Sequence, residues 1–265
     1  MPTQNPVVEF YSGLVADVYD IIFPPDKPQE DEELFAGLIA RGDGPALEIG
    51  CGTGRLLFRL LKRGLDVEGL DLAPDMLKIC RERGQAQGFE PVLYEASMVD
   101  FDLGKRYATV FVPFNSFQIL TDRKDAQKCL ETMFAHTAPG GQTILTTCTH
   151  WEDMFPGHLP GDRPWKLIRT GRDEARDLFV TSNAAAHVDR TEQIQTNWFR
   201  YDVYQGGRMV DSTSRVEVIR YYHKFEIQMM MERAGFTDVQ VLGDEGDVPA
   251  TDLHMNWVVK GTRRK

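Results

Sequence analysis

The chain has 265 residues, of which 42% are hydrophobic and 26% are charged. This length and composition suit a globular protein with a sizeable core and argue against a disordered chain. The formal net charge is −10. A surface of that sign repels phosphate backbones, so nucleic acid is not expected as a partner.

The sequence also limits where the protein works. It contains no run of 18 apolar residues, and its first residues lack the basic and apolar regions of a signal peptide. The four cysteines are far apart and form no CxxC pair, so neither a disulfide framework nor a zinc site is predicted. We therefore expect a cytoplasmic protein with no metal site and no membrane partner.

The first 44 residues are expected to be mainly helical. Residues 7–22 are amphipathic and rich in aromatic side chains, and residues 28–40 place apolar side chains at helical spacing after an acidic first turn. Turn residues at 42–45 then end the second helix. We expect residues 1–44 to form a helical lid on the domain that follows.

From residue 46 the pattern alternates between short buried strands and helices. Strands are expected at 46–49, 67–71, 91–94, 107–113 and 142–148, with helices at 56–61, 74–83 and 122–138 between them. Gly84 is expected to end the helix that begins at Pro74. This rhythm predicts an α/β domain built on a parallel sheet with helices on both faces.

Residues 150–222 break this rhythm. Alternating side chains dominate 178–222, and Gly206-Gly207 separates two strand-like runs, which predicts an antiparallel hairpin. Helix and strand patterns return at 225–234, 239–242 and 255–259. We expect residues 1–265 to form one domain with a β-rich insertion at 150–222, whose hairpin is a candidate surface for a homodimer.

Glycines at positions 50, 52 and 54 follow the first strand and precede a helix. Glycines let the backbone turn sharply beside a ligand, and a helix N-terminus presents free N–H groups. The dinucleotide fingerprint G-x-G-x-x-G would need glycine at position 55, where Arg55 stands. Glu48 precedes the loop, and Asp71 ends the next strand, where a carboxylate can accept from both hydroxyls of a ribose.

Two segments, LEIGCGTG at 47–54 and GLDLAPDML at 69–77, resemble the first two motifs of the class I S-adenosylmethionine-dependent methyltransferases. Looser similarity to small-molecule members of this family continues at 113–120, 130–145 and 220–236, so the resemblance covers nearly the whole chain. It implies a Rossmann-like three-layer sandwich with a mostly parallel seven-stranded sheet whose last strand is antiparallel. It also implies S-adenosyl-L-methionine as the methyl donor and S-adenosyl-L-homocysteine as the product.

The resemblance assigns a donor site to this chain. Its residues would be Tyr19, Glu48, Gly50, Cys51, Gly52, Thr53, Gly54, Asp71, Leu72, Met76, Ser97, Met98 and Asn115. Many relatives carry an acid at the position of Ser97 and a histidine at the position of Ile119, so this chain departs from the family at both. A histidine-assisted transfer at position 119 is not expected, because isoleucine cannot move a proton.

Candidates for the acceptor side come from the lid, the segment after the fourth strand and the insertion, which would cover the acceptor. Tyr19 and Gln118 are the candidate catalytic residues. The candidate substrate-binding residues, which equally suit packing or ion pairs, are Tyr11, Trp198, Arg200, Arg220 and Tyr222.

Methyl transfer from a sulfonium is an in-line displacement on an activated donor. The protein then mainly supplies orientation, which contributes about 7–11 kcal/mol in favourable cases. No obvious base follows Asn115, which favours an amine as acceptor, with a hydroxyl close behind. We therefore predict a methyltransferase that acts on a nitrogen or oxygen of a small molecule. A nicotinamide-dependent oxidoreductase and a non-catalytic S-adenosylmethionine-binding module are the alternatives.

Overall fold

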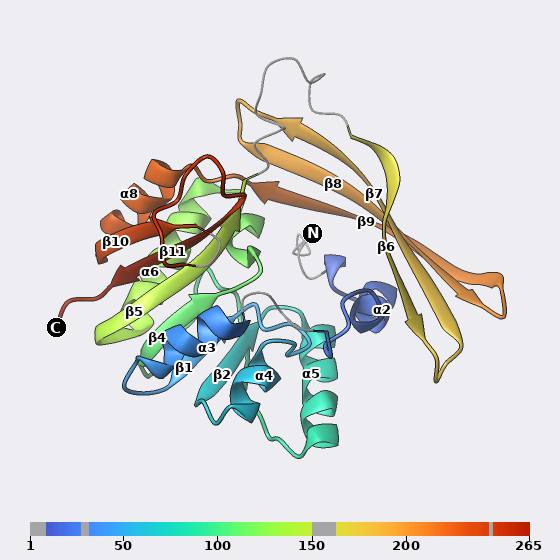
Figure 1. Cartoon of the computed structure of the whole chain (residues 1–265), viewed down its shortest axis with the longest axis horizontal. Coiled ribbons are helices and arrows are strands. Elements are labelled where there is room, and N and C mark those ends of the chain that lie inside the picture. The colour runs from blue at the N-terminus through green and yellow to red at the C-terminus, as the bar shows by residue number, and fades with distance from the viewer. Residues whose placement is uncertain (1–8, 28–31, 150–162, 244–245) are drawn as a thin grey trace, which may run out of the picture.

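The computed structural model describes residues 9–27, 32–149, 163–243 and 246–265, and these form two sheets (Figure 1). The larger sheet has the strand order β10–β11–β5–β4–β1–β2–β3. In it, β11 runs antiparallel to both of its neighbours, whereas the other pairs are parallel. The smaller sheet, β6–β7–β8–β9, is antiparallel throughout. The predicted seven-stranded Rossmann-like sheet with an antiparallel last strand is thus confirmed.

The elements alternate as the sequence predicts. The α/β domain comprises α3 (Glu32–Ala40), β1 (Ala46–Ile49), α4 (Leu57–Lys62), β2 (Val67–Asp71), α5 (Pro74–Gln87), β3 (Leu93–Glu95), β4 (Tyr107–Val112), the 3₁₀ turn η1 (Ser116–Ile119), α6 (Arg123–His136), β5 (Thr137–Cys148), α8 (Lys224–Ala234), β10 (Thr237–Leu242) and β11 (Asn256–Thr262). The small sheet comprises β6 (Arg163–Asp173), β7 (Leu178–Asp189), β8 (Ile194–Gln205) and β9 (Arg208–Arg220), and α2 (Leu14–Ile22) precedes both units.

Two local predictions need correction. Helix α5 runs past Gly84 to Gly88, which adopts the left-handed conformation that ends it. Gly84 instead gives room for a neighbour, because a Cβ there would lie 2.8 Å from Cδ of Pro91. The helix predicted at 7–22 is interrupted: residues 9–10 are helical, and α2 begins at Leu14, after Gly13 with its φ of 53°. The predicted hairpin at Gly206-Gly207 is confirmed as β8 and β9, and β6 and β7 extend it to a four-stranded sheet. Parts of the predicted elements at 7–8, 28–31 and 150–162 lie outside the described residues.

The large sheet is buried on both faces, as parallel sheets usually are. All four residues of β1 are buried, and successive side chains enter different cores. Leu47 and Ile49 pack with α6 and α8 on one face, whereas Ala46 packs with α3 and α4 on the other. Burial of each such leucine or isoleucine contributes about 1.5–3 kcal/mol. Within the described residues, no helix is both long and apolar enough to span a membrane.

Helix α2 joins the α/β domain to the small sheet (Figure 1). One of its faces buries Val15 and Val18 against Val180 and Val203 of the small sheet. Its opposite side places Ala16 beside Met76 of α5. The helix therefore positions the inner face of the small sheet over the carboxyl ends of the parallel strands.

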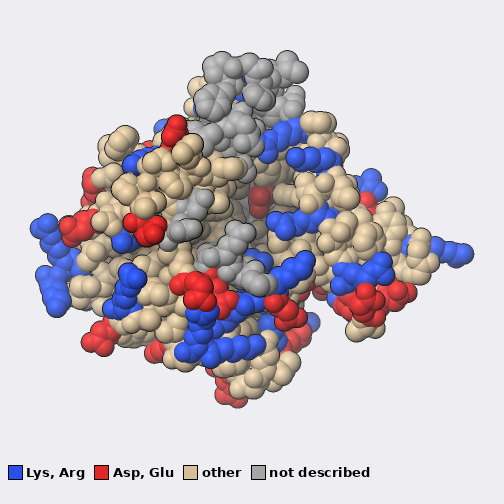
Figure 2. Space-filling model, in the orientation of Figure 1, with Lys and Arg blue, Asp and Glu red and all other residues tan. Residues whose placement is uncertain are grey.

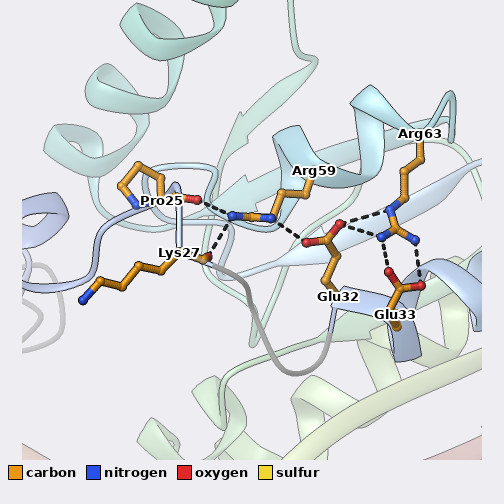
Figure 3. Close-up of polar contacts among 6 residues, drawn as sticks. All are labelled: Pro25, Lys27, Glu32, Glu33, Arg59 and Arg63. Atoms are coloured by element: carbon orange, nitrogen blue, oxygen red, sulfur yellow. Dashed lines mark hydrogen bonds and ion pairs between the residues drawn. The ribbon is translucent and has the colours of Figure 1, made fainter.

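A cluster of charged side chains holds the start of α3 against α4 (Figure 3). Arg59 forms an ion pair of 2.6 Å with Glu32 and donates hydrogen bonds of 2.8 Å to the carbonyls of Pro25 and Lys27. Arg63 bridges Glu32 and Glu33. Pro25 and Lys27 after α2 and the first residues of α3 are thereby held against the helix that follows the glycine loop.

Candidate functional site

A cavity of about 650 Å³ opens at the carboxyl ends of β1, β2, β3 and β4, in the size range of small-molecule sites. Ligands of open α/β sheets bind at this edge. Figure 2 shows a hollow between the α/β domain and the small sheet on this face of the molecule. The predicted site residues that line the cavity are Tyr11, Tyr19, Gly50, Cys51, Gly52, Thr53, Asp71, Leu72, Met76, Ser97 and Met98.

The glycine loop forms the floor of the cavity, and its shape requires glycine. Gly52 and Gly54 have φ values of 54° and 80°, a region that other residues rarely adopt. A Cβ on Gly54 would lie 2.5 Å from the Phe58 ring and 2.7 Å from Sγ of Cys80. The loop therefore packs on α4 and α5 without side chains of its own at these positions, and its backbone faces the cavity.

Asp71 is fixed at the end of β2 by backbone donors. Its Oδ2 accepts from Gly52 N at 2.7 Å, and its Oδ1 accepts from Ala73 N at 2.9 Å. Burial raises the pKa of the Asp71 carboxyl, while these N–H groups and that of Leu72 oppose the rise. Each oxygen keeps a further lone pair for a ligand in the cavity, which fits the hydroxyls of a ribose.

Helix α2 is bonded to the glycine loop through Thr53. Its Oγ1 donates to Asp20 of α2 at 2.8 Å, and its carbonyl accepts from Arg83 at 2.6 Å. Arg83 also forms an ion pair with Asp20. Burial raises the pKa of Asp20, while Arg83 and Thr53 oppose the rise. Asp20 and Arg83 were not predicted as site residues, since their pairing depends on the packing of α2 against α5.

Aromatic side chains surround the entrance. Tyr11 and Tyr19 lie with ring centroids 6.0 Å apart, and Arg55 lies over the rings of Phe114, Phe23 and Tyr19 at 4.5, 5.5 and 5.8 Å. Arg55 and Phe114 line the cavity, although the sequence indicated neither as a site residue. Phe114 has a left-handed backbone with φ of 54°, a conformation that is uncommon outside functional sites and turns.

The charge of the cavity wall discriminates between ligands. Four carboxylates line it, those of Asp71, Asp100, Asp122 and Asp125, against the single guanidinium of Arg55 among the described residues. A wall of this sign suits a cationic sulfonium ligand. The residues present therefore fit S-adenosylmethionine: backbone and glycines beneath it, a carboxylate for the ribose, and apolar Leu72 and Met76 for the adenine.

Three predicted donor-site residues do not line the cavity. Glu48 is buried within β1, directly before the loop, and Gly54 lies beneath the loop against Phe58. Asn115 has a left-handed backbone with φ of 60°, and its N–H donates to Oγ1 of Thr146 at 3.1 Å. These positions indicate support of the loop and of the wall rather than contact with a ligand.

Gln118, Arg220 and Tyr222 form a buried junction between η1 and the end of β9. Gln118 Nε2 donates to the carbonyls of Arg220 and Cys148 at 2.9 and 3.1 Å. Arg220 donates to the carbonyls of Thr121 and Glu192 at 2.7 Å each, and Tyr222 donates to that of Leu120 at 2.6 Å. None of the three lines the cavity. Backbone carbonyls accept the hydrogen bonds that these three side chains donate. This corrects the expectation that Gln118 is catalytic and that Arg220 and Tyr222 contact the substrate.

Trp198 and Arg200 lie on the outer face of the small sheet. Side chains alternate along β8, and Asn197 and Tyr201 are the buried ones on the inner face. Trp198 pairs with Val216, and its side chain is 39% exposed, while Arg200 forms an ion pair of 2.8 Å with Asp202. The structure thus does not bring these two predicted substrate contacts to the cavity, which lies on the other face.

Comparison with known proteins agrees with this geometry. Residues 46–141 match the family model described as a methyltransferase domain. The chain is 34% identical over 155 residues to the dTDP-3-amino-3,6-dideoxy-alpha-D-glucopyranose N,N-dimethyltransferase of Streptomyces fradiae, covering 56% of this chain and 59% of that one. It is 26% identical over 226 residues to the dTDP-3-amino-3,4,6-trideoxy-alpha-D-glucopyranose N,N-dimethyltransferase of Streptomyces venezuelae, covering 83% and 89%.

A solved structure shows the same fold over nearly the whole chain. The CcbJ methyltransferase of Streptomyces caelestis superposes with a TM-score of 0.76 at 24% identity, covering 96% of this chain and 98% of that one. The first of the two relatives is matched over less than two thirds of its length, the second over most of it. Family model, relatives, fold and glycine-loop geometry agree. Residues 46–141 thus match a methyltransferase domain, and the chain is similar in sequence to sugar N,N-dimethyltransferases and in fold to S-adenosylmethionine-dependent methyltransferases.

Proposed function

We propose that this methyltransferase transfers the methyl group of S-adenosylmethionine to the amino nitrogen of a deoxyamino sugar carried on a nucleoside diphosphate. Both relatives are named as N,N-dimethyltransferases of such sugars. The observation that carries the proposal is the carboxylate-lined cavity above the glycine loop, at the edge where the lid and the small sheet meet the parallel strands. This arrangement suits a cationic donor beside a small polar acceptor.

On the donor side, the backbone from Gly50 to Gly52 would hold the methionine part, and Asp71 would bind the ribose hydroxyls. Leu72, Met76 and the loop at 96–100 would contact the adenine. When bound, S-adenosylmethionine supplies a methyl group on a sulfonium, which an acceptor nitrogen displaces in line. The chain's own contribution is to orient the two reactants and to keep water from the reacting atoms.

On the acceptor side, Tyr11 and Tyr19 present hydroxyls at the cavity, and Phe114 presents an apolar ring. Arg55 and Arg169 both lie over the Phe23 ring, at 5.5 and 4.7 Å from its centroid. Guanidinium groups bind phosphate oxygens in pairs, so these two would hold the diphosphate of the acceptor. Residues of the insertion, from Arg163 onward, would then cover the sugar.

Arg55, which stands where the dinucleotide fingerprint needs its third glycine, disfavours the nicotinamide-dependent oxidoreductase, and so does the match of residues 46–141 to a methyltransferase domain. A non-catalytic module that only binds S-adenosylmethionine is the remaining alternative. Turnover separates the two: an enzyme converts the donor to S-adenosylhomocysteine only with an acceptor present, whereas a binding module retains it unchanged.

The proposal is tested by calorimetry with S-adenosylmethionine, followed by mass spectrometry with a panel of dTDP-3-amino and dTDP-4-amino sugars. We expect binding of the donor, and a product that carries one and then two added methyl groups. Matched sugars with a hydroxyl in place of the amine serve as controls. Donor binding without transfer to any amine, or transfer to the hydroxyl sugars alone, would contradict the proposal.

A further inference from the structure

Glu217 is a partly buried carboxylate that forms no ion pair with a cation among the described residues. It lies on β9, and burial is the largest influence on its pKa, which is raised. Among the described residues, no Lys, Arg or His forms an ion pair with it. Its hydrogen bonds come from neutral groups: Asn197 Nδ2 donates to Oε2 at 3.3 Å, and the Tyr11 hydroxyl donates to Oε1 at 3.4 Å.

The carboxylate lies behind Tyr11, on the acceptor side of the cavity but not in its wall. Glu217 pairs with Asn197 on the inner face of the small sheet, opposite to the face of Trp198. Tyr11, which bonds to it, lines the cavity. Glu217 also influences the pKa of four other groups, on elements that converge on this space: Tyr19 of α2, Tyr201 of β8, Cys148 of β5 and Tyr11 itself.

On its other side, Glu217 is held by a chain of neutral polar groups. Asn197 accepts from Gln195 at 2.6 Å, and Gln195 in turn accepts from the Tyr221 hydroxyl. These amides fix the carboxylate but bring no charge to it. The Tyr11 side therefore remains the direction from which a cation can approach, and that side is the cavity.

A buried carboxylate without a counter-ion destabilises a folded protein, and such groups gather at functional sites. An aliphatic amine is mainly an ammonium ion near neutral pH and cannot attack the donor until it loses a proton. The substrate would thus bring the missing positive charge. The carboxylate would gain a partner on binding and could then take the proton, since burial has raised its pKa toward the range of a general base.

We propose that Glu217 is the counter-ion and the final proton acceptor for the acceptor's ammonium group, and that it acts through the Tyr11 hydroxyl. This inference rests on the proposed amine acceptor and deepens it. Tyr11 touches the acceptor and Glu217 is a positioning residue behind it. The 3.4 Å bond between them is long, as hydrogen bonds of catalytic groups often are before substrate binds.

An N–H proton of the ammonium passes to the Tyr11 oxygen while the Tyr11 proton passes to Glu217, which leaves a neutral amine, a neutral tyrosine and a neutral carboxylic acid. The nitrogen lone pair then forms the N–C bond, and the C–S bond breaks with its electron pair on sulfur. The product is a methylated ammonium and S-adenosylhomocysteine, and the carboxyl group returns its proton to solvent.

The test compares Glu217→Gln with Asp211→Asn, which removes the same charge from an exposed position on the same strand. The probe is dTDP-3-amino-3,6-dideoxyglucose with S-adenosylmethionine. We expect Glu217→Gln to lower kcat/KM on the order of 100-fold at neutral pH, with recovery as rising pH supplies free amine. Donor affinity should stay unchanged, and Asp211→Asn should follow the wild-type profile.

The pH profile is interpretable because the other groups that face Glu217 are neutral near pH 7. Burial raises the pKa of Tyr11, Tyr19 and Tyr201, and that of Cys148 to about 11. Asp71 is the other carboxylate whose charge is felt at Tyr11. Wild-type kcat/KM should therefore fall on the acid side as Glu217 is protonated. In Glu217→Gln this limb should be replaced by a rise at the higher pH at which the amine itself loses its proton.

Binding gives a second readout that does not depend on turnover. With S-adenosylhomocysteine bound, the wild type should prefer the 3-amino sugar nucleotide over its 3-hydroxy counterpart, and Glu217→Gln should lose that preference. Should Glu217→Gln fail to fold, Tyr11→Phe breaks the same contact from the other side and should give the same loss. Glu217→Asp should restore part of the rate.

The outcomes separate the two proposals. Wild-type methylation of the amine reports on the proposed function alone. If the amine is methylated and Glu217→Gln keeps the wild-type rate, pH profile and amine preference, the role of Glu217 is overturned while the function stands. If the wild type neither binds nor methylates any amine in preference to its hydroxyl counterpart, both are overturned.

Discussion

The donor side of the cavity comes mainly from one stretch of chain, residues 46–76, completed by the loop at 96–100, whereas the acceptor side is assembled from segments far apart in the sequence. On the donor side, backbone N–H groups and glycines form the surface, and Asp71 is oriented by the backbone itself. On the acceptor side, side chains of the lid, the end of β4 and the small sheet meet across helix α2. Local geometry determines the first, and tertiary packing determines the second.

This difference predicts where substitutions act. Changes on the donor side should weaken S-adenosylmethionine binding whichever acceptor is offered. Changes on the acceptor side should leave donor affinity intact and alter the choice or the rate of the acceptor. A donor-side variant that alters only the use of the acceptor, or an acceptor-side variant that weakens donor binding, would show that the two sides are not separate.

The largest effect is expected from Asp71→Ala. It removes both acceptors for the ribose hydroxyls and frees Gly52 N, and loss of hydrogen bonds to a charged group should lower donor affinity about 100-fold. Calorimetry measures this. Asp66→Ala, an exposed residue directly before β2, is the matched control and should bind the donor as the wild type does.

The same residue gives a pH dependence. Because the Asp71 pKa is raised in the folded protein, the carboxylate and its donor affinity are complete above that pKa and decline as pH falls through it. Asp71→Asn should bind more weakly and show no such decline. Equal acid sensitivity in both proteins would assign the decline to another group.

The next effect concerns the loop's shape. Gly54→Ala combines a left-handed backbone with a Cβ 2.5 Å from the Phe58 ring, so strain and overpacking together should reduce the free energy of unfolding by about 2–4 kcal/mol. Gly64→Ala has the same backbone strain, with φ of 77°, but nothing within 4 Å, and should lose about 1–2 kcal/mol. Denaturant unfolding compares them, and equal losses would show that close packing under the loop is unimportant.

A smaller effect is expected where the lid meets the loop. Asp20→Asn weakens the ion pair with Arg83 while keeping an acceptor for Thr53, so donor affinity should fall about three- to tenfold. Asp17→Asn, exposed on the same helix, should have no effect. If Asp20→Asn lowered the affinity for the acceptor alone, α2 would belong to the acceptor side of the cavity.

The smallest effect is expected on the outer face of the small sheet. Trp198→Ala should change kcat/KM by less than about twofold, because its side chain points away from the cavity. The homodimer expected through this sheet stays a prediction, and sedimentation of wild type and variant tests it. A large loss of activity in a variant that keeps the oligomeric state of the wild type would restore Trp198 as a substrate contact.

The donor side could be predicted from sequence because its signals are local. Glycine spacing, the acid at the end of β2 and the proline at the start of α5 each follow from backbone geometry over a few residues. The acceptor side could not be predicted in this way. Successive side chains of a strand point to opposite faces of the sheet, and the sequence does not show which face is turned to the cavity. Trp198 and Arg200 are the aromatic and basic residues that the sequence indicated on β8. Each lies one position away from a residue that faces inward, Asn197 or Tyr201.

Other residues were missed because only tertiary contacts reveal them. Glu217 is one of 40 acidic residues, and nothing adjacent in sequence indicates that it is partly buried without a cation. In the sequence, Arg55 served only as evidence against a dinucleotide site. Its place over the Phe114 ring is visible only in the folded structure. Gln118 had the position of a site residue, but its amide is used by the carbonyls of Cys148 and Arg220.

The central claim, methyl transfer to a sugar amine, is tested most directly with methyl-labelled S-adenosylmethionine and an equal mixture of a dTDP-3-amino sugar and its 3-hydroxy counterpart. We predict that one and then two labelled methyl groups are recovered on the nitrogen, and that one S-adenosylhomocysteine is formed for each methyl group transferred. Label recovered on the hydroxyl sugar, or retained on the donor in the presence of both, would contradict it.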